Sequence, residues 1–190
     1  MQTKKRGGSL RLLLTLALLS AIGIILGKFL AFNITDFMRF SLENLTILLC
    51  GIAFGPIPGL AVGIVQDIVG CLLRGYILNP IITVGSGTVG LVAGLVYKYT
   101  DGMKSGLRIA VSVIPAHLVG SVLIKSLGLV IYYSLPFTAT VLWRILNYVI
   151  VGAIEVILLI YLLKSKLLFT EIQKIRPYSR TKKGDEEHDI

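Results

Sequence analysis

The chain has 190 residues, of which 55% are hydrophobic and only 15% are charged. Its mean hydropathy of +0.84 is too high for a soluble globular domain and predicts an integral membrane protein. A net charge of +9 is compatible with nucleic-acid binding, but most of the basic residues lie in the tails and in one loop. This distribution is typical of membrane topology, so we expect no nucleic-acid partner.

Motifs for catalysis or metal binding are missing from the sequence. Cys50 and Cys71 both lie inside apolar runs, where cysteine behaves as a small hydrophobe. There is no CxxC, HExxH, Walker or GxGxxG pattern, and no pair of carboxylates or His-Glu cluster is expected at one membrane depth. General acid–base catalysis needs such groups, so we expect a protein that is not an enzyme and that uses no cofactor or metal.

The first apolar run covers residues 10–31 and follows a short basic tail, residues 1–9. It is longer than the apolar region of a signal peptide and opens a chain that stays apolar, so it predicts a spanning helix. Within it, Ala17 and Ala21 are four residues apart. The run also contains Gly23 and Gly27, offset by about half a turn. Small residues at this spacing allow another helix to approach closely.

Five further apolar runs predict five more helices, at residues 41–54, 60–73, 81–97, 109–133 and 137–163. The run at 41–54 is short for a straight span, which needs about 20 residues. Polar connectors are expected at residues 33–39, 74–80 and 98–108, and a tight Gly-Pro turn at 55–59. We therefore expect one six-helix membrane domain at residues 10–165 and a polar tail at 166–190, disordered at its end.

Six spans place both termini on the same side of the membrane. In this scheme 14 of the 19 Lys and Arg residues lie on the terminal side, which predicts cytoplasmic termini in the plasma membrane. Five lie on or toward the opposite, outer side: Lys28, Arg39, Arg74, Lys125 and Arg144. The acidic residues expected in that half are Asp36 and Glu43. The excess of positive charge predicts an outer cavity for an anion.

Basic residues near helix ends can instead extend to lipid headgroups, and this interpretation is favoured for Lys28. Arg144 shares a helix face with Asn147 and Tyr148, which favours a ligand contact or a buried ion pair. Asp67 and Glu155 are expected deeper in the membrane, as structural partners of Gln66, of His117 or of each other. The roles of these four residues stay open.

Two stretches resemble a known family. Residues 51–70, GIAFGPIPGLAVGIVQDIVG, resemble the second-to-third helix signature of the S components of energy-coupling factor (ECF) vitamin transporters. Residues 76–94, together with Trp143-Arg144 and Glu155, resemble the folate branch. The resemblance covers about residues 10–165 and implies an all-α integral membrane protein, a six-transmembrane-helix bundle of the ECF S-component type, without a catalytic site of its own.

This resemblance implies a substrate-binding subunit of an ABC importer for high-affinity uptake of folate or a related anionic vitamin. The implied partners are a transmembrane coupling subunit and two cytoplasmic ATPase subunits. Ala17 and Ala21 match the family's docking motif for the coupling subunit. Two alternatives stay open: an S component for another metabolite, such as pantothenate or a queuosine precursor, and a secondary transporter that works alone.

A folate pocket should combine basic groups for the carboxylates with aromatic and hydrogen-bonding groups for the pterin ring. The basic candidates are Arg39, Arg74, Lys125 and Arg144. The aromatic candidates are Tyr76, Tyr132, Tyr133 and Trp143, for which an aromatic belt at the membrane interface is an equal alternative. The hydrogen-bonding candidates are Glu43, Asn44, Asn79 and Asn147.

Overall fold

The computed structural model describes residues 3–29, 31–33, 39–166, 170 and 172, and side chains from residue 10 onward except those of Asn33 and Arg39. Seven α-helices and one π-helix make up nearly all of this part. They are α1 (Thr3–Phe29), α2 (Asn44–Phe54), α3 (Pro56–Arg74), α4 (Pro80–Tyr99), α5 (Ser105–Ala116), the π-helix η1 (His117–Ile124), α6 (Lys125–Tyr133) and α7 (Phe137–Lys164). A short antiparallel hairpin of β1 (Phe32–Asn33) and β2 (Arg39–Phe40) joins α1 to α2.

The segments α5, η1 and α6 follow one another without a break and form one continuous helical segment, which we call the rod, from Ser105 to Tyr133. With this rod counted once, the described residues form six helical segments, so the predicted six-helix architecture is confirmed. Five of them are long and apolar enough to span a membrane, and the exception is α2 with 11 residues. All residues of α2 are buried. It therefore serves as a core helix, which explains how so short a segment fits into the bundle.

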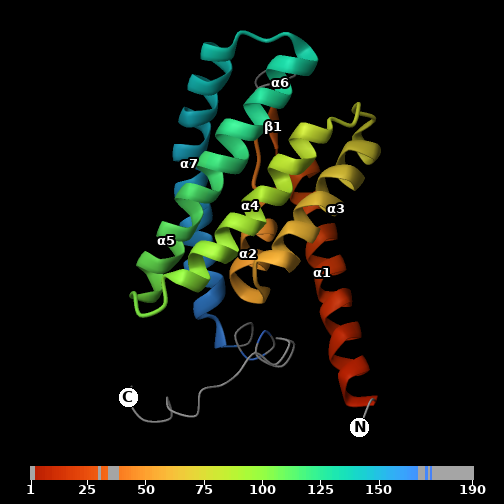
Figure 1. The fold of residues 1–190 in the computed structure, drawn as a ribbon, viewed down its shortest axis with the longest axis vertical. Helices are drawn as coiled ribbons and strands as arrows, with labels where there is room; N and C mark the ends of the chain where they lie inside the picture. The colour runs from red at the N-terminus through yellow and green to blue at the C-terminus, as the bar shows by residue number, and fades with distance from the viewer. Residues whose placement is uncertain (1–2, 30, 34–38, 167–169, 171, 173–190) are drawn as a thin grey trace.

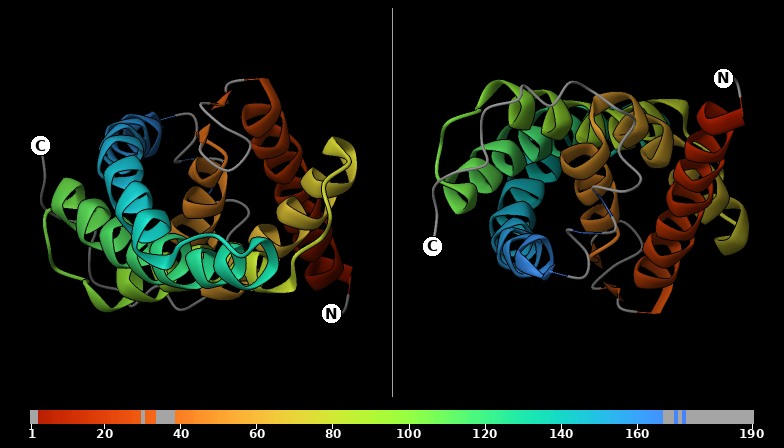
Figure 2. Two further views of the ribbon diagram at one scale, coloured as in Figure 1. Left: turned by 90° about the horizontal axis from the view of Figure 1, so that it is seen from above. Right: turned by 90° about the horizontal axis from the view of Figure 1, so that it is seen from below.

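The ends of the helices lie at two opposite ends of the molecule (Figure 1). We call the end where α1 begins and α7 finishes the terminal end. The opposite end, which we call the hairpin end, carries β1 and β2, the α3–α4 connection and the α6–α7 connection. Seen along the bundle from either side, α2 lies between α1 and α7 (Figure 2).

Local chemistry sets two of the helix boundaries. Gly55 has a φ of 106°, which favours glycine. Pro56 follows at the first position of α3, where a backbone N–H would have no partner within the helix and proline is therefore tolerated. The predicted turn at 55–59 was therefore too long, and only Gly55 lies outside the helices. At α4, the Asn79 side chain caps the helix by accepting hydrogen bonds from the backbone N–H groups of Ile81 and Ile82.

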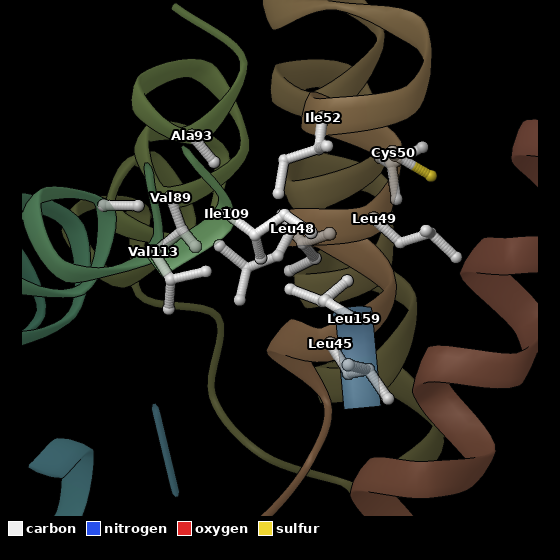
Figure 3. Packing of buried hydrophobic residues seen from close by; sticks show 13 residues of the cluster. Leu45, Leu48, Leu49, Cys50, Ile52, Val89, Ala93, Ile109, Val113 and Leu159 are labelled. Carbon is white, nitrogen blue, oxygen red and sulfur yellow. The ribbon is translucent and has the colours of Figure 1, made fainter. Parts of the chain in front are cut away.

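The core lies where α2 meets α4, α5 and α7. Leu48 from α2, Ile109 from α5 and Leu159 from α7 are at most 1% exposed and point toward one another (Figure 3). Next to this cluster, α3 and α4 approach closely through glycines, and a Cβ atom on Gly59 would lie 2.7 Å from the carbonyl oxygen of Gly90. The glycine-rich helix α4 therefore packs closely against α3.

Candidate functional site

A polar cavity opens at the hairpin end, between the C-terminal part of α3, the start of α4, α6 and the first half of α7. Its volume is about 320 Å³, within the range of small-molecule sites. Three cations line it, Arg74, Lys125 and Arg144, together with two carboxylates, Glu43 and Asp67. The remaining lining residues are aromatic, amide, small or aliphatic: Tyr76, Tyr133, Trp143, Tyr148, Asn79, Asn147, Ser41, Cys71, Ile77, Ile82 and Leu129.

The structure brings together most of the residues predicted to bind substrate. Nine of the twelve candidates line the cavity: Glu43, Arg74, Tyr76, Asn79, Lys125, Tyr133, Trp143, Arg144 and Asn147. Asn44 is buried behind the wall and accepts a hydrogen bond from Lys125. Tyr132 is 49% exposed and is not a lining residue, whereas its neighbour Tyr133 is. The side chain of Arg39 lies outside the described residues, as does Asp36.

Arg74 is held by neighbours on three sides. Its Nε donates to the carbonyl oxygen of Gly70 at 2.8 Å, and its Nη1 lies 3.5 Å from Oε2 of Glu43. The guanidinium carbon is 5.9 Å from the centre of the Tyr76 ring, within the range of a cation–π contact. Arg74 therefore lines the cavity as a cation whose charge is partly balanced by Glu43.

Lys125 and Arg144 have polar but uncharged neighbours. Nζ of Lys125 donates to Oδ1 of Asn44 at 3.5 Å, and Nη1 of Arg144 donates to the carbonyl oxygen of Ser121 at 2.9 Å. Nε of Arg144 is buried and has no hydrogen-bond partner among the described residues. No carboxylate of the described part of the chain lies within 4 Å of either cation. Cations in such surroundings are costly and favour an anionic ligand.

Asp67 does not have the partners that we predicted for it. Its Oδ2 accepts a hydrogen bond from Thr83 at 2.7 Å, and its Oδ1 accepts one from Ser86 at 3.2 Å. Gln66, the neighbouring residue, instead bonds Thr46 and the carbonyl oxygen of Glu43. Asp67 therefore belongs to the cavity wall, which the count of charges in the outer half had missed.

The expectation that no His-Glu pair would lie at one membrane depth was wrong, whereas His117 was among the partners that we considered for Glu155. Nε2 of His117 lies 2.6 Å from Oε2 of Glu155, and both side chains are buried. The His117 ring stacks on the ring of Tyr148, which lines the cavity. Trp143 makes an edge-to-face contact with Phe40 of β2, which connects the hairpin to α7. Lys28 is exposed and is not a lining residue, consistent with a contact to lipid headgroups.

Six apolar helical segments, five of them long enough to span a membrane, and a polar cavity at one end of the bundle define the class as a multi-pass membrane protein with a candidate small-molecule site. Residues 11–170 match the family described as "ECF transporter, substrate-specific component", and the chain belongs to this family. Such substrate-specific components are subunits of transporters. No curated protein sequence matches the chain.

Two solved structures are similar over most of their length. The first is described as "Crystal structure of FolT bound with folic acid", with a TM-score of 0.65 and 25% sequence identity, covering 79% of this chain and 90% of that one. The second is described as "Structure and mechanism of the S component of a bacterial ECF transporter", with a TM-score of 0.60 and 22% identity, covering 90% of this chain and 99% of that one. The predicted family and fold are thus confirmed.

Proposed function

We propose that the protein is the folate-binding S component of an ECF-type ABC importer. The observation that carries this proposal is the cavity at the hairpin end, where Lys125 and Arg144 have no carboxylate partner among the described residues. Folate offers carboxylates for these cations and a flat pterin ring for the aromatic side chains that line the same cavity. The similarity to FolT, described with bound folic acid, supports this choice of vitamin.

The orientation that we propose follows from charge. With 14 of 19 Lys and Arg residues on the terminal side, the termini face the cytoplasm and the cavity faces the outside of the cell. Folate would thus enter from the extracellular side. The sequence contains no Walker motif for ATP binding. We therefore propose that the energy for uptake comes from partner subunits, namely a transmembrane coupling subunit and two cytoplasmic ATPases.

For the coupling subunit we propose a docking face on α1. Ala17 and Ala21 are both exposed. Gly23 and Gly27 lie on a different face, against α2 and α3, where an added Cβ on Gly27 would lie 2.7 Å from Oε2 of Glu43. The glycine face is thus used inside the bundle and the alanine face is available for another helix.

Calorimetric titration of the purified full-length protein in detergent tests the choice of ligand. We expect folate to bind with a micromolar or lower Kd, and pantothenate, used as a control, not to bind. Mass spectrometry of small molecules that co-purify with the protein provides an independent check. Absence of folate binding at micromolar concentrations, or binding of pantothenate or a queuosine precursor instead, would overturn the assignment of folate.

Reconstitution into liposomes tests the mode of transport. The proposal predicts no folate uptake by this chain alone under an ion gradient, and uptake once the coupling subunit, both ATPases and ATP are supplied. Uptake driven by a gradient alone would identify a secondary transporter.

A further inference from the structure

Asp67 is a carboxylate in the membrane part of the chain whose surroundings differ from those of Glu43, the other carboxylate of the cavity. It lies on α3 and lines the cavity, and each of its two oxygens accepts a hydrogen bond from a hydroxyl group of α4. The two donors, Thr83 and Ser86, fix the orientation of the carboxylate.

The hydroxyl groups do not balance the charge of Asp67. No Lys or Arg nitrogen of the described residues lies within 4 Å of it, whereas Glu43 is paired with Arg74. A carboxylate has about four acceptor positions, and the two hydroxyl groups occupy two of them. A carboxylate at membrane depth is costly unless further donors reach it, and it is a functional-site candidate for this reason.

The cavity is the place from which such donors can come. We propose that Asp67 determines specificity by accepting hydrogen bonds from a donor-bearing edge of the substrate, such as the amino group and ring N–H of an aminopyrimidine. Lys125 and Arg144, on α6 and α7, then bind the anionic part of the same molecule. The substrate that fits this arrangement carries both carboxylates and a ring with hydrogen-bond donors. This inference rests on the proposed function and adds to it the residue that recognises the ring by accepting its hydrogen bonds.

A cycle of two ligands and two proteins tests the assignment. The ligands are folate and an analogue in which a methyl group replaces the 2-amino group, and the proteins are the wild type and Asp67→Asn. We expect the wild type to bind folate about 10- to 100-fold more tightly than the analogue, as for a hydrogen bond to a charged group. In Asp67→Asn this ratio should fall toward one, because the neutral amide makes a weaker acceptor.

Glu43→Gln is the matched control, since it removes the other carboxylate of the cavity, and it should keep the wild-type ratio. If Asp67→Asn does not fold, Thr83→Val replaces it, because loss of the 2.7 Å hydrogen bond that orients Asp67 should also lower the ratio. An unchanged ratio in the Asp67 variant, equal weakening of both ligands, or a ratio lost in Glu43→Gln instead would overturn the inference. If the wild type does not bind folate at all, the proposed function fails first and this assignment with it.

Discussion

The Nε2 atom of His117 lies 2.6 Å from Oε2 of Glu155 and joins η1 to α7 in the interior of the bundle. The two side chains are 5% and 0% exposed. On its other side His117 approaches the hydroxyl group of Ser121, and its ring lies 4.6 Å from that of Tyr148 at an angle of 24°. Because Tyr148 lines the cavity, this pair supports the cavity wall from behind.

Removing one member of this pair should destabilise the protein strongly. In Glu155→Ala, the buried His117 ring would lose its hydrogen-bond partner, and leaving a buried polar group without a partner typically costs about 1–3 kcal/mol. The measurement is the free energy of unfolding in detergent, followed by tryptophan fluorescence of Trp143 as denaturant is added.

Asp101→Ala provides the control. Asp101 forms an ion pair with Arg108 at 3.0 Å, but its side chain is 85% exposed. Exposed pairs contribute about 0–1 kcal/mol, so this variant should unfold almost as the wild type does. Equal losses in the two variants would show that burial of the His117–Glu155 pair has no energetic consequence.

Replacing Arg144 by alanine should weaken folate binding. Arg144 lines the cavity and has no carboxylate within 4 Å in the described part of the chain. Loss of one partner of a desolvated charge pair costs about 2–5 kcal/mol of binding free energy. Titration calorimetry measures this loss, with Lys28→Ala as the control because Lys28 is exposed and is not a lining residue. An unchanged affinity in Arg144→Ala would assign the side chain to the membrane interface instead.

Cations were the most informative feature of the sequence. A charged residue in an apolar run is costly, so it is retained for a reason, and Arg74, Lys125 and Arg144 all line the cavity. The rotation of a helix could not be predicted in the same way. Tyr132 and Tyr133 are neighbours on α6, and only Tyr133 lines the cavity, because successive residues of a helix point about 100° apart.

Contacts between helices were harder to predict than the helices themselves. Asp67 was expected to have Gln66, His117 or Glu155 as its partner, whereas its partners are hydroxyl groups of α4. No pattern within α3 marks such partners, since they depend on how closely two helices pack. The π-helical turn from His117 to Ile124 was likewise not predicted. Pro115 just before it was the only local signal, as proline removes a backbone donor within a helix.

A methyl group at Gly90 should destabilise the bundle. A Cβ atom there would collide with the backbone of Gly59, and backbone atoms cannot move aside as a side chain can. Overpacking of this kind costs about 1–3 kcal/mol, so Gly90→Ala should lower the Tm in detergent. Gly106→Ala is the control, because the nearest atom to its Cβ would be 3.6 Å away and alanine favours helix. A lower Tm in both variants would point to a general effect of glycine replacement.

Bulky residues at Ala17 and Ala21 should separate binding from transport. Both positions are exposed on α1 and distant in the chain from the residues that line the cavity, so the double variant Ala17→Trp, Ala21→Trp should keep the wild-type Kd for folate. Close approach of a partner helix requires small residues, so folate uptake by liposomes that contain the complete transporter should be lost.

The control for this variant is Ile22→Trp, which adds the same side chain at a position that is 40% exposed and lies on a different part of the α1 surface. If bulk on α1 matters only at the alanine face, this control retains uptake and still co-purifies with the coupling subunit, whereas the double variant does neither. Loss of folate binding together with uptake in the double variant would contradict the docking assignment, because the alanines would then support the fold of the cavity itself. Loss of uptake in the control as well would mean that no particular face of α1 is used.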